Sequence, residues 1–268
     1  MKLLCLVLML CLSLNACDGK KLDGVYDSGA FSLEFKGGKV YQLDKMTSLE
    51  MEFDYKVDGN KLKLSTPSGN MVMTILDNGS IKGMGGIYFE EAKIKKLSGD
   101  FRNINIYLYA YQDMFKALPG DDGKVLSHLN KASLATTGGV LSNGIIDGQW
   151  NSTTLTDESV LFWQHIRLAG FAQGSVDVAD KNYLPRNENN GRLGIQSSNG
   201  FNTISGMTGS YAVCSENILG HQVKIIDITM DDGDTGEGVL RAVIAGNPVA
   251  VATENIVETS PYTVCMSI

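Results

Sequence analysis

Short runs of alternating apolar and polar residues fill the first third of the chain. Three of these runs cover residues 31–35, 51–57 and 71–75. An alternation of period two is typical of strands that bury one face. Glycine and asparagine, which tolerate the backbone angles of tight turns, occupy residues 58–60 and 77–80 between the runs. This pattern predicts an antiparallel meander of six or so strands that closes into a small barrel or sandwich.

The spacing of apolar residues changes to three and four beyond residue 100, which is typical of one buried stripe on a helix. This stripe consists of Ile104, Tyr107, Leu108, Tyr111, Met114, Phe115 and Leu118. The predicted helix begins near Phe101 and ends at Pro119 and Gly120, which cannot continue it. A second helix is predicted over residues 157–173, with Thr156 as its N-cap.

After Gly174 the sequence is typical of strands separated by glycine-containing turns. We expect these strands at residues 192–196, 209–214, 239–244 and 262–266. The order is then helix, long loop, second helix and antiparallel strands. The predicted fold class is α+β, with a small antiparallel β barrel or sandwich followed by a domain in which a helix packs on an antiparallel sheet.

The charge balance differs between the two parts of the chain. Residues 17–96 contain 12 lysines, no arginine and 12 acidic residues, whereas residues 97–268 contain five lysines, five arginines and 18 acidic residues. We therefore assign a β domain to 17–92, a polar linker to 93–100 and a second domain to 101–268. The formal net charge of the whole chain is -7, which argues against nucleic-acid binding because that requires a basic face.

The N-terminus has the features of a secretory signal peptide. Lys2 is followed by an apolar run over residues 3–14, which is too short to anchor a chain across a bilayer. One interpretation of this segment is an ordinary cleaved signal peptide with a cysteine, Cys17, near its end by chance.

The sequence Leu14-Asn15-Ala16-Cys17 resembles the lipobox of bacterial lipoproteins. The resemblance implies that residues 1–16 are removed and that Cys17 carries acyl chains, which attach the protein to a membrane. Asp18 resembles the residue that retains lipoproteins at the inner membrane. We therefore expect the periplasmic face of the inner membrane rather than the outer membrane.

Cysteine counting gives each of the five cysteines a place. Cys5 and Cys11 leave with the signal peptide and Cys17 takes lipid, so Cys214 and Cys265 remain in a compartment where disulfides persist. We predict that these two residues pair. The alternatives are two free buried thiols or a zinc site, and the absence of further cysteines or paired histidines disfavours zinc.

The β-rich part looks like a recurrent small bacterial lipoprotein domain. The segments that carry this resemblance are residues 22–27, 31–40, 55–64 and 73–86. The resemblance implies a fold but no defined activity.

Several blocks in the second part occur in a recognisable order. They cover residues 109–115, 118–122, 143–150, 158–170, 190–196, 213–220, 227–242 and 262–265. Together they are similar to the head domains of type IV pilin-like and type II secretion pseudopilin-like proteins. The basic leader and the apolar first half of the prepilin helix are not recognisable, so the first helix of this head is expected to be truncated.

The resemblance implies a non-enzymatic accessory or structural component of a type IV pilus or type II secretion type apparatus, with pilus or secretion-system proteins as partners. An alternative is an envelope small-ligand-binding or inhibitor lipoprotein that uses its β domain. A hydrolase has no support, because the sequence contains no nucleophile elbow, HExxH motif or glycine-rich phosphate loop.

An acidic segment near the C-terminus concentrates oxygen ligands among glycines. Asp231, Asp232, Asp234 and Glu237 are the candidate calcium ligands, with Asp227 just before them. The resemblance to major pseudopilins, which carry calcium in a C-terminal loop, supports this interpretation. The alternative is a solvated acidic turn, and the spacing is not that of an EF-hand.

Overall fold

The computed structural model describes residues 21–77, 79–84 and 86–268; the signal segment 1–16 and Cys17 lie outside the described residues. Contacts within the chain separate two compact units, with the division after Ala92, and each unit is described by itself. None of the helices in the described part of the chain has the length and apolar character needed to cross a membrane. The fold class is α+β, as predicted.

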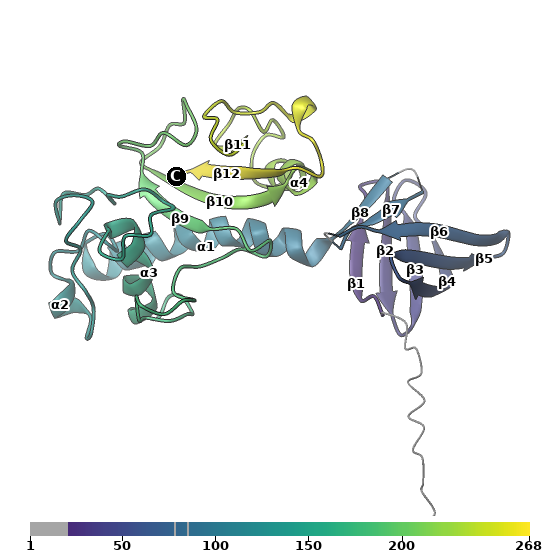
Figure 1. Ribbon diagram of the computed structural model, residues 1–268, viewed down its shortest axis with the longest axis horizontal. Helices are drawn as coiled ribbons and strands as arrows, with labels where there is room; N and C mark the ends of the chain where they lie inside the picture. The colour runs from purple at the N-terminus through teal and green to yellow at the C-terminus, as the bar shows by residue number, and fades with distance from the viewer. Residues whose placement is uncertain (1–20, 78, 85) are drawn as a thin grey trace, which may run out of the picture. The chain divides into compact units, whose positions relative to one another are not determined.

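The first unit is a closed antiparallel barrel (Figure 1). Its strands are β1 Gly24–Asp27, β2 Phe31–Lys36, β3 Lys39–Asp44, β4 Leu49–Asp58, β5 Lys61–Thr66, β6 Gly69–Ile75, β7 Ile81–Gly83 and β8 Gly86–Glu90. Each strand pairs with the next, and β1 pairs with β8, where Tyr26 lies opposite Glu90. The barrel therefore has more strands than the six or so expected, and it has no open sheet edge between β1 and β8.

The barrel interior is filled by side chains from the inward-facing positions of the strands. Leu33, Val40, Leu62 and Leu64 are fully buried, and Phe35 packs edge-on against Tyr26 and Tyr55. Alternate positions, such as those of the lysines in β5, point outward. The period-two pattern of the sequence is thus the inside-outside alternation of a small barrel with a packed core.

The helix α1 runs from Glu91 to Phe115 and corrects two predictions. Residues 93–100 are helical rather than a linker, and the helix begins ten residues before Phe101. The reason is that Ile94 and Leu97 extend the buried stripe by two turns at helical spacing. The lysines between these residues lie on the exposed side of the same helix and do not interrupt it.

The second unit contains a four-stranded antiparallel sheet in the order β11-β12-β10-β9. The strands are β9 Leu193–Ser197, β10 Tyr211–Leu219, β11 Leu240–Val243 and β12 Pro261–Ser267, close to the predicted positions. Figure 1 shows this sheet along α1, whose buried residues include Phe101, Ile104 and Leu108. The predicted antiparallel sheet and helices of an α+β unit are present.

Three further helices and a short 3-10 turn complete the second unit within the described residues. They are α2 Val125–His128, α3 Glu158–Leu168, α4 Gly220–Met230 and η1 Thr253–Asn255. α3 is shorter than the predicted 157–173, because Gly170 adopts a positive φ of 83° just after its C-cap. Its N-cap is Asp157 rather than Thr156.

Candidate functional site

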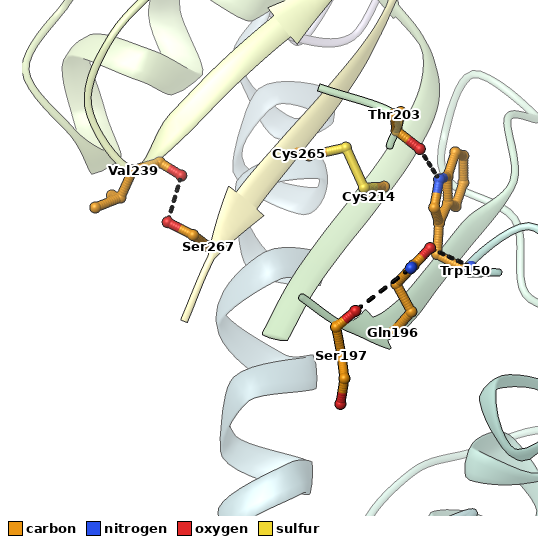
Figure 2. Close-up of a disulfide and its surroundings, with 8 residues drawn as sticks. All are labelled: Trp150, Gln196, Ser197, Thr203, Cys214, Val239, Cys265 and Ser267. Atoms are coloured by element: carbon orange, nitrogen blue, oxygen red, sulfur yellow. Dashed lines mark hydrogen bonds between the residues drawn. A yellow bond between two sulfur atoms is a disulfide. The ribbon is translucent and has the colours of Figure 1, made fainter. Parts of the chain in front are cut away.

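The disulfide between Cys214 and Cys265 is present and joins the two central strands of the sheet. Cys214 on β10 lies directly opposite Cys265 on β12, and both are fully buried. Figure 2 shows Trp150 beside this bond, where its indole Nε1 donates to Thr203 Oγ1 at 2.9 Å. The backbone N–H of Trp150 donates to Gln196 Oε1 on β9 at 3.0 Å, which ties the loop to the sheet. The bond therefore lies in a packed core, where its role is structural.

The acidic cluster forms where α4 ends. Asp227 lies in the last turn of α4, Asp231 is the C-cap, and Asp232 follows it. One carboxylate oxygen from each of these three residues can be chosen so that all three oxygens lie within 4.8 Å of one another. The backbone N–H of Asp231 donates to the Asp227 carbonyl oxygen, so the chain leaves the helix close to the last turn that carries Asp227. Sequence reasoning treated Asp227 as the start of a loop, because α4 was not predicted.

Asp227 is the most unusual member of this cluster. Its side chain is fully buried, and neither carboxylate oxygen has a hydrogen-bond partner among the described residues. Burial, together with the carboxylates of Asp231, Asp232 and Asp234 and against an opposing effect of the Gly233 backbone N–H, raises the pKa of Asp227 to about 6. An unpaired buried carboxylate is costly, so this arrangement favours either a proton or a bound cation at Asp227.

The predicted ligands Asp234 and Glu237 do not join this group of three. Asp234 Oδ1 accepts a hydrogen bond from the Gly236 N–H at 3.0 Å within the loop. Glu237 is exposed and its Oε2 lies 3.5 Å from Nη2 of Arg241. The structure thus brings together Asp231 and Asp232 from the predicted set and adds Asp227.

The donor set fits a hard divalent cation such as calcium. Calcium takes six to eight oxygen ligands, and three carboxylates supply up to six. Asp231 is held in place because its Oδ2 accepts a hydrogen bond from the Leu240 N–H at 2.8 Å. The tight approach of the loop to this carboxylate is made by Gly238, which has a φ of +67°. Asp227, Asp231 and Asp232 are therefore the residues that could hold the ion.

Asp121 and Asp122, in the loop after α1, have hydrogen-bond partners within the protein. The carboxylate of Asp121 accepts hydrogen bonds from the N–H groups of Asn143 and Gly144. That of Asp122 accepts from Tyr111 Oη at 2.8 Å and contacts His128 Nδ1 at 2.6 Å. These contacts fix the loop after α1 and leave the two residues in structural roles.

Glu158 forms a second buried acid site that the sequence did not reveal. Its Oε2 accepts a hydrogen bond from the Asp147 N–H at 2.8 Å, while its buried Oε1 has no partner in the described part of the chain. Burial, together with the nearby carboxylates of Asp121, Asp147 and Asp157 and against the hydrogen bond from the Asp147 N–H, raises the pKa of Glu158 to about 7. Glu158 is therefore partly protonated near neutral pH.

His165 on α3 is fully buried and has both ring nitrogens engaged. Nδ1 accepts from the Gly120 N–H and Nε2 contacts the Ser133 carbonyl oxygen, each at 2.9 Å. Burial lowers the pKa of His165, which favours the neutral ring. These two contacts join α3 to the loop after α1 and to the segment around Ser133, so the role of His165 is structural.

Comparisons with protein-family models, with curated proteins and with solved structures find no match for this chain.

Proposed function

We propose that the protein is a lipid-anchored envelope protein with a pilin-like or pseudopilin-like head, and that it serves as an accessory or structural component of a type IV pilus or type II secretion type apparatus. In this proposal Cys17 carries the lipid, and the second unit makes the protein contacts. The protein has no catalytic role in this proposal.

The observation that carries this proposal is the packing of α1 along an antiparallel sheet whose last strand is covalently fixed. Phe101, Ile104 and Leu108 form the buried stripe of α1. The sheet is locked by the bond between Cys214 and Cys265. A helix on a four-stranded antiparallel sheet is the arrangement that the pilin-like sequence blocks imply for a head domain.

The alternative, in which the barrel binds a small envelope molecule, has less support. The interior of the barrel is occupied by its own side chains, including Leu33, Phe35 and Leu64. Small-ligand sites are concave and bury most of the ligand, and this interior is instead a core. The barrel is therefore better suited to act as a spacer or to contribute an outer surface.

Partners of the head are expected to present basic or polar surfaces. The head, residues 101–268, contains 17 acidic and ten basic side chains and therefore carries a net charge of -7. Complementary charge speeds association and selects partners more than it adds affinity. We expect recovery of these partners to fall with rising salt.

Crosslinking in intact cells followed by purification of the tagged full-length protein tests this proposal. We expect pilus or secretion-system proteins among the crosslinked species from wild type. The Cys17→Ser variant should lose them, because it leaves the membrane, whereas Cys11→Ser should retain them. Recovery of a tightly bound small molecule without any such protein contradicts the proposal and supports the ligand-binding alternative.

A further inference from the structure

A cavity of about 340 Å³ in the second unit gathers positive charge in an otherwise acidic domain. It is lined by residues 153–155 of one loop, by residues 178–186 of another, and by Arg192 next to the start of β9. Lys181, Arg186 and Arg192 line it, with Asp180 as its single acidic residue. Three of the ten basic side chains of residues 97–268 therefore converge on one small cavity.

The two arginines are held next to each other by the backbone. Arg186 and Arg192 form an isolated antiparallel bridge, closed by a turn in which the Asn187 N–H donates to the Gly191 carbonyl at 2.9 Å. The Asn187 side chain anchors this turn to the sheet by donating to Ser215 Oγ at 2.7 Å. Like charges placed directly opposite each other across two strands are destabilising. The fold maintains this pair through a rigid turn rather than separating it.

Neither guanidinium forms an ion pair with a carboxylate among the described residues, although the Glu216 carboxylate lies near Arg192. Arg186 Nη1 donates to the Asn190 carbonyl and Arg192 Nη2 to the Ser152 carbonyl, at 2.7 and 2.8 Å. The buried Nε of Arg192 has no hydrogen-bond partner, and the ion pairs among described residues include neither arginine. Burial lowers the pKa of Arg192 and the charge of Arg186 lowers it further, against an opposing effect of the Glu216 carboxylate.

The neighbouring acid does not balance these charges. Asp180 Oδ1 accepts from the Asn182 N–H at 2.8 Å within its own loop. The hydrogen bonds from the Asn182 N–H and the Ser175 side chain lower the pKa of the Asp180 carboxyl, and the charge of Lys181 lowers it further. The charge of the cavity is therefore positive overall.

The rest of the lining is apolar. Leu155, Val178 and Leu184 line the cavity together with the ring of Tyr183. Tyr183 is fixed because its hydroxyl donates to the Val160 carbonyl at 2.8 Å, and Arg167 stacks over its ring. A small concave site with an apolar wall and a few converging charged groups is the usual form of a ligand pocket.

We propose that this cavity binds a small organic anion, with its carboxylate or phosphate group on Arg186 and Arg192 and its apolar part against Leu155 and Leu184. Guanidinium groups present planar, paired donors that match the oxygens of carboxylates and phosphates. The bound anion neutralises the two facing arginines. This site lies within the second unit and does not depend on the proposed function.

Isothermal titration calorimetry on the detergent-solubilised full chain at low salt tests the proposal. The probes are benzoate and phenyl phosphate, with benzyl alcohol as the neutral match. We expect at least one of the two anions to bind, the alcohol not to bind, and affinity to fall as salt rises. The ratio of the two affinities identifies the preferred anionic group.

Two variants and a control locate the binding. Arg186→Gln should weaken binding at least tenfold, and Arg192→Lys should weaken it less, because lysine keeps the charge but lacks the paired donors. Arg102→Gln removes an exposed arginine of α1 and should leave binding unchanged. Circular dichroism spectra that match wild type verify the fold of each variant. Absence of binding by both anions at millimolar concentration, or equal affinities for wild type and Arg186→Gln, overturns the proposal.

Discussion

Gly238 lies against the carboxylate of Asp231 so closely that a Cβ atom at this glycine would stand 2.1 Å from Oδ2 of Asp231. The same Cβ would lie 2.9 Å from Oδ2 of Asp232. The loop after α4 therefore wraps two carboxylates around a position that only glycine can occupy. A side chain at this position would have to displace the carboxylates of Asp231 and Asp232, and so would separate them from Asp227.

Calcium should stabilise the second unit through these three acids. A cation that binds only the folded state raises the free energy of unfolding by about 2.7 kcal/mol at a hundredfold excess over Kd. Millimolar calcium should thus raise the melting temperature of the full chain in differential scanning calorimetry. Magnesium should raise it less, because it holds its waters and requires a stricter octahedron.

Substitutions should separate the ion ligands from the surrounding acids. Asp227→Asn should raise stability without calcium, because it removes a buried unpaired carboxylate, and should also abolish the calcium response. Glu237→Gln alters an exposed residue outside the group of three and should keep the response. A calcium-induced shift of the same size in wild type and in Asp227→Asn is incompatible with this site, and so is no shift in wild type.

Stability should fall as the pH rises through the range set by Glu158. The pKa of its carboxyl is raised from 4.5 to about 7 in the folded protein, so folding favours the protonated form. Its favourable contribution is therefore complete below about pH 4.5 and is lost as the pH rises through 7. Asp227 and Asp100, whose pKa values are both raised to about 6, contribute in the same direction.

Glu158→Gln should reduce this pH dependence. The amide stays neutral and can still accept the Asp147 N–H, so we expect a gain on the order of 2 kcal/mol at pH 8, since one pKa unit corresponds to about 1.4 kcal/mol. Urea unfolding at pH 5 and at pH 8 measures the free energy of unfolding of both proteins. Glu254→Gln, at an exposed position, is the matched control. If the free energy of unfolding changes equally between pH 5 and pH 8 in wild type and in Glu158→Gln, Glu158 does not cause the pH dependence.

Loss of the disulfide should weaken the second unit. The bond closes a loop with a sequence separation of 51 residues. The chain-entropy model assigns such a crosslink about 4 kcal/mol, and a Cys214→Ser, Cys265→Ser double variant should lose that amount in urea unfolding. Dithiothreitol should destabilise wild type and leave the double variant unchanged. A reductant effect on the double variant would assign the loss to something other than this bond.

Anchoring through Cys17 should be visible by labelling. Labelled palmitate should enter wild type, and Cys17→Ser should abolish both the labelling and the recovery in membranes. Cys11→Ser removes a cysteine of the predicted signal and should leave both unchanged. Fractionation of wild type should place it with the inner membrane, as Asp18 suggests, and recovery only in outer-membrane fractions would reverse that expectation.

The strands were the part of the fold most open to prediction from sequence. Alternation such as that of Leu62 and Leu64, with glycine at the turns, reports burial on one face and needs only neighbouring residues. The helix α4 was missed because Ile225, Ile226 and Ile228 are β-branched, and such residues favour strands unless tertiary packing selects the helix. The residues that pack against α4 are distant in the sequence, so the local pattern does not reveal this packing.

The candidate sites depend on the same distinction. Asp231 and Asp232 could be found in the sequence as an acidic run. Asp227 joins them because it lies in the last turn of α4, one turn before the C-cap Asp231. The facing of Arg186 and Arg192 depends on a turn whose Asn187 anchor reaches β10, about 28 residues further along the chain. Contacts at that separation are set by the fold and leave no short-range pattern.

The strand order of the second unit also determines when its sheet can assemble. β12 is the last strand of this unit in sequence, yet it lies between β10 and β11. During synthesis or export, β10 and β11 therefore have no shared partner until residues 261–267 have emerged, and the partner of Cys214 emerges with them. A chain interrupted before Pro261 leaves two separated sheet fragments with exposed edges and one unpaired thiol. Completion of this sheet is thus coupled to the arrival of its final strand.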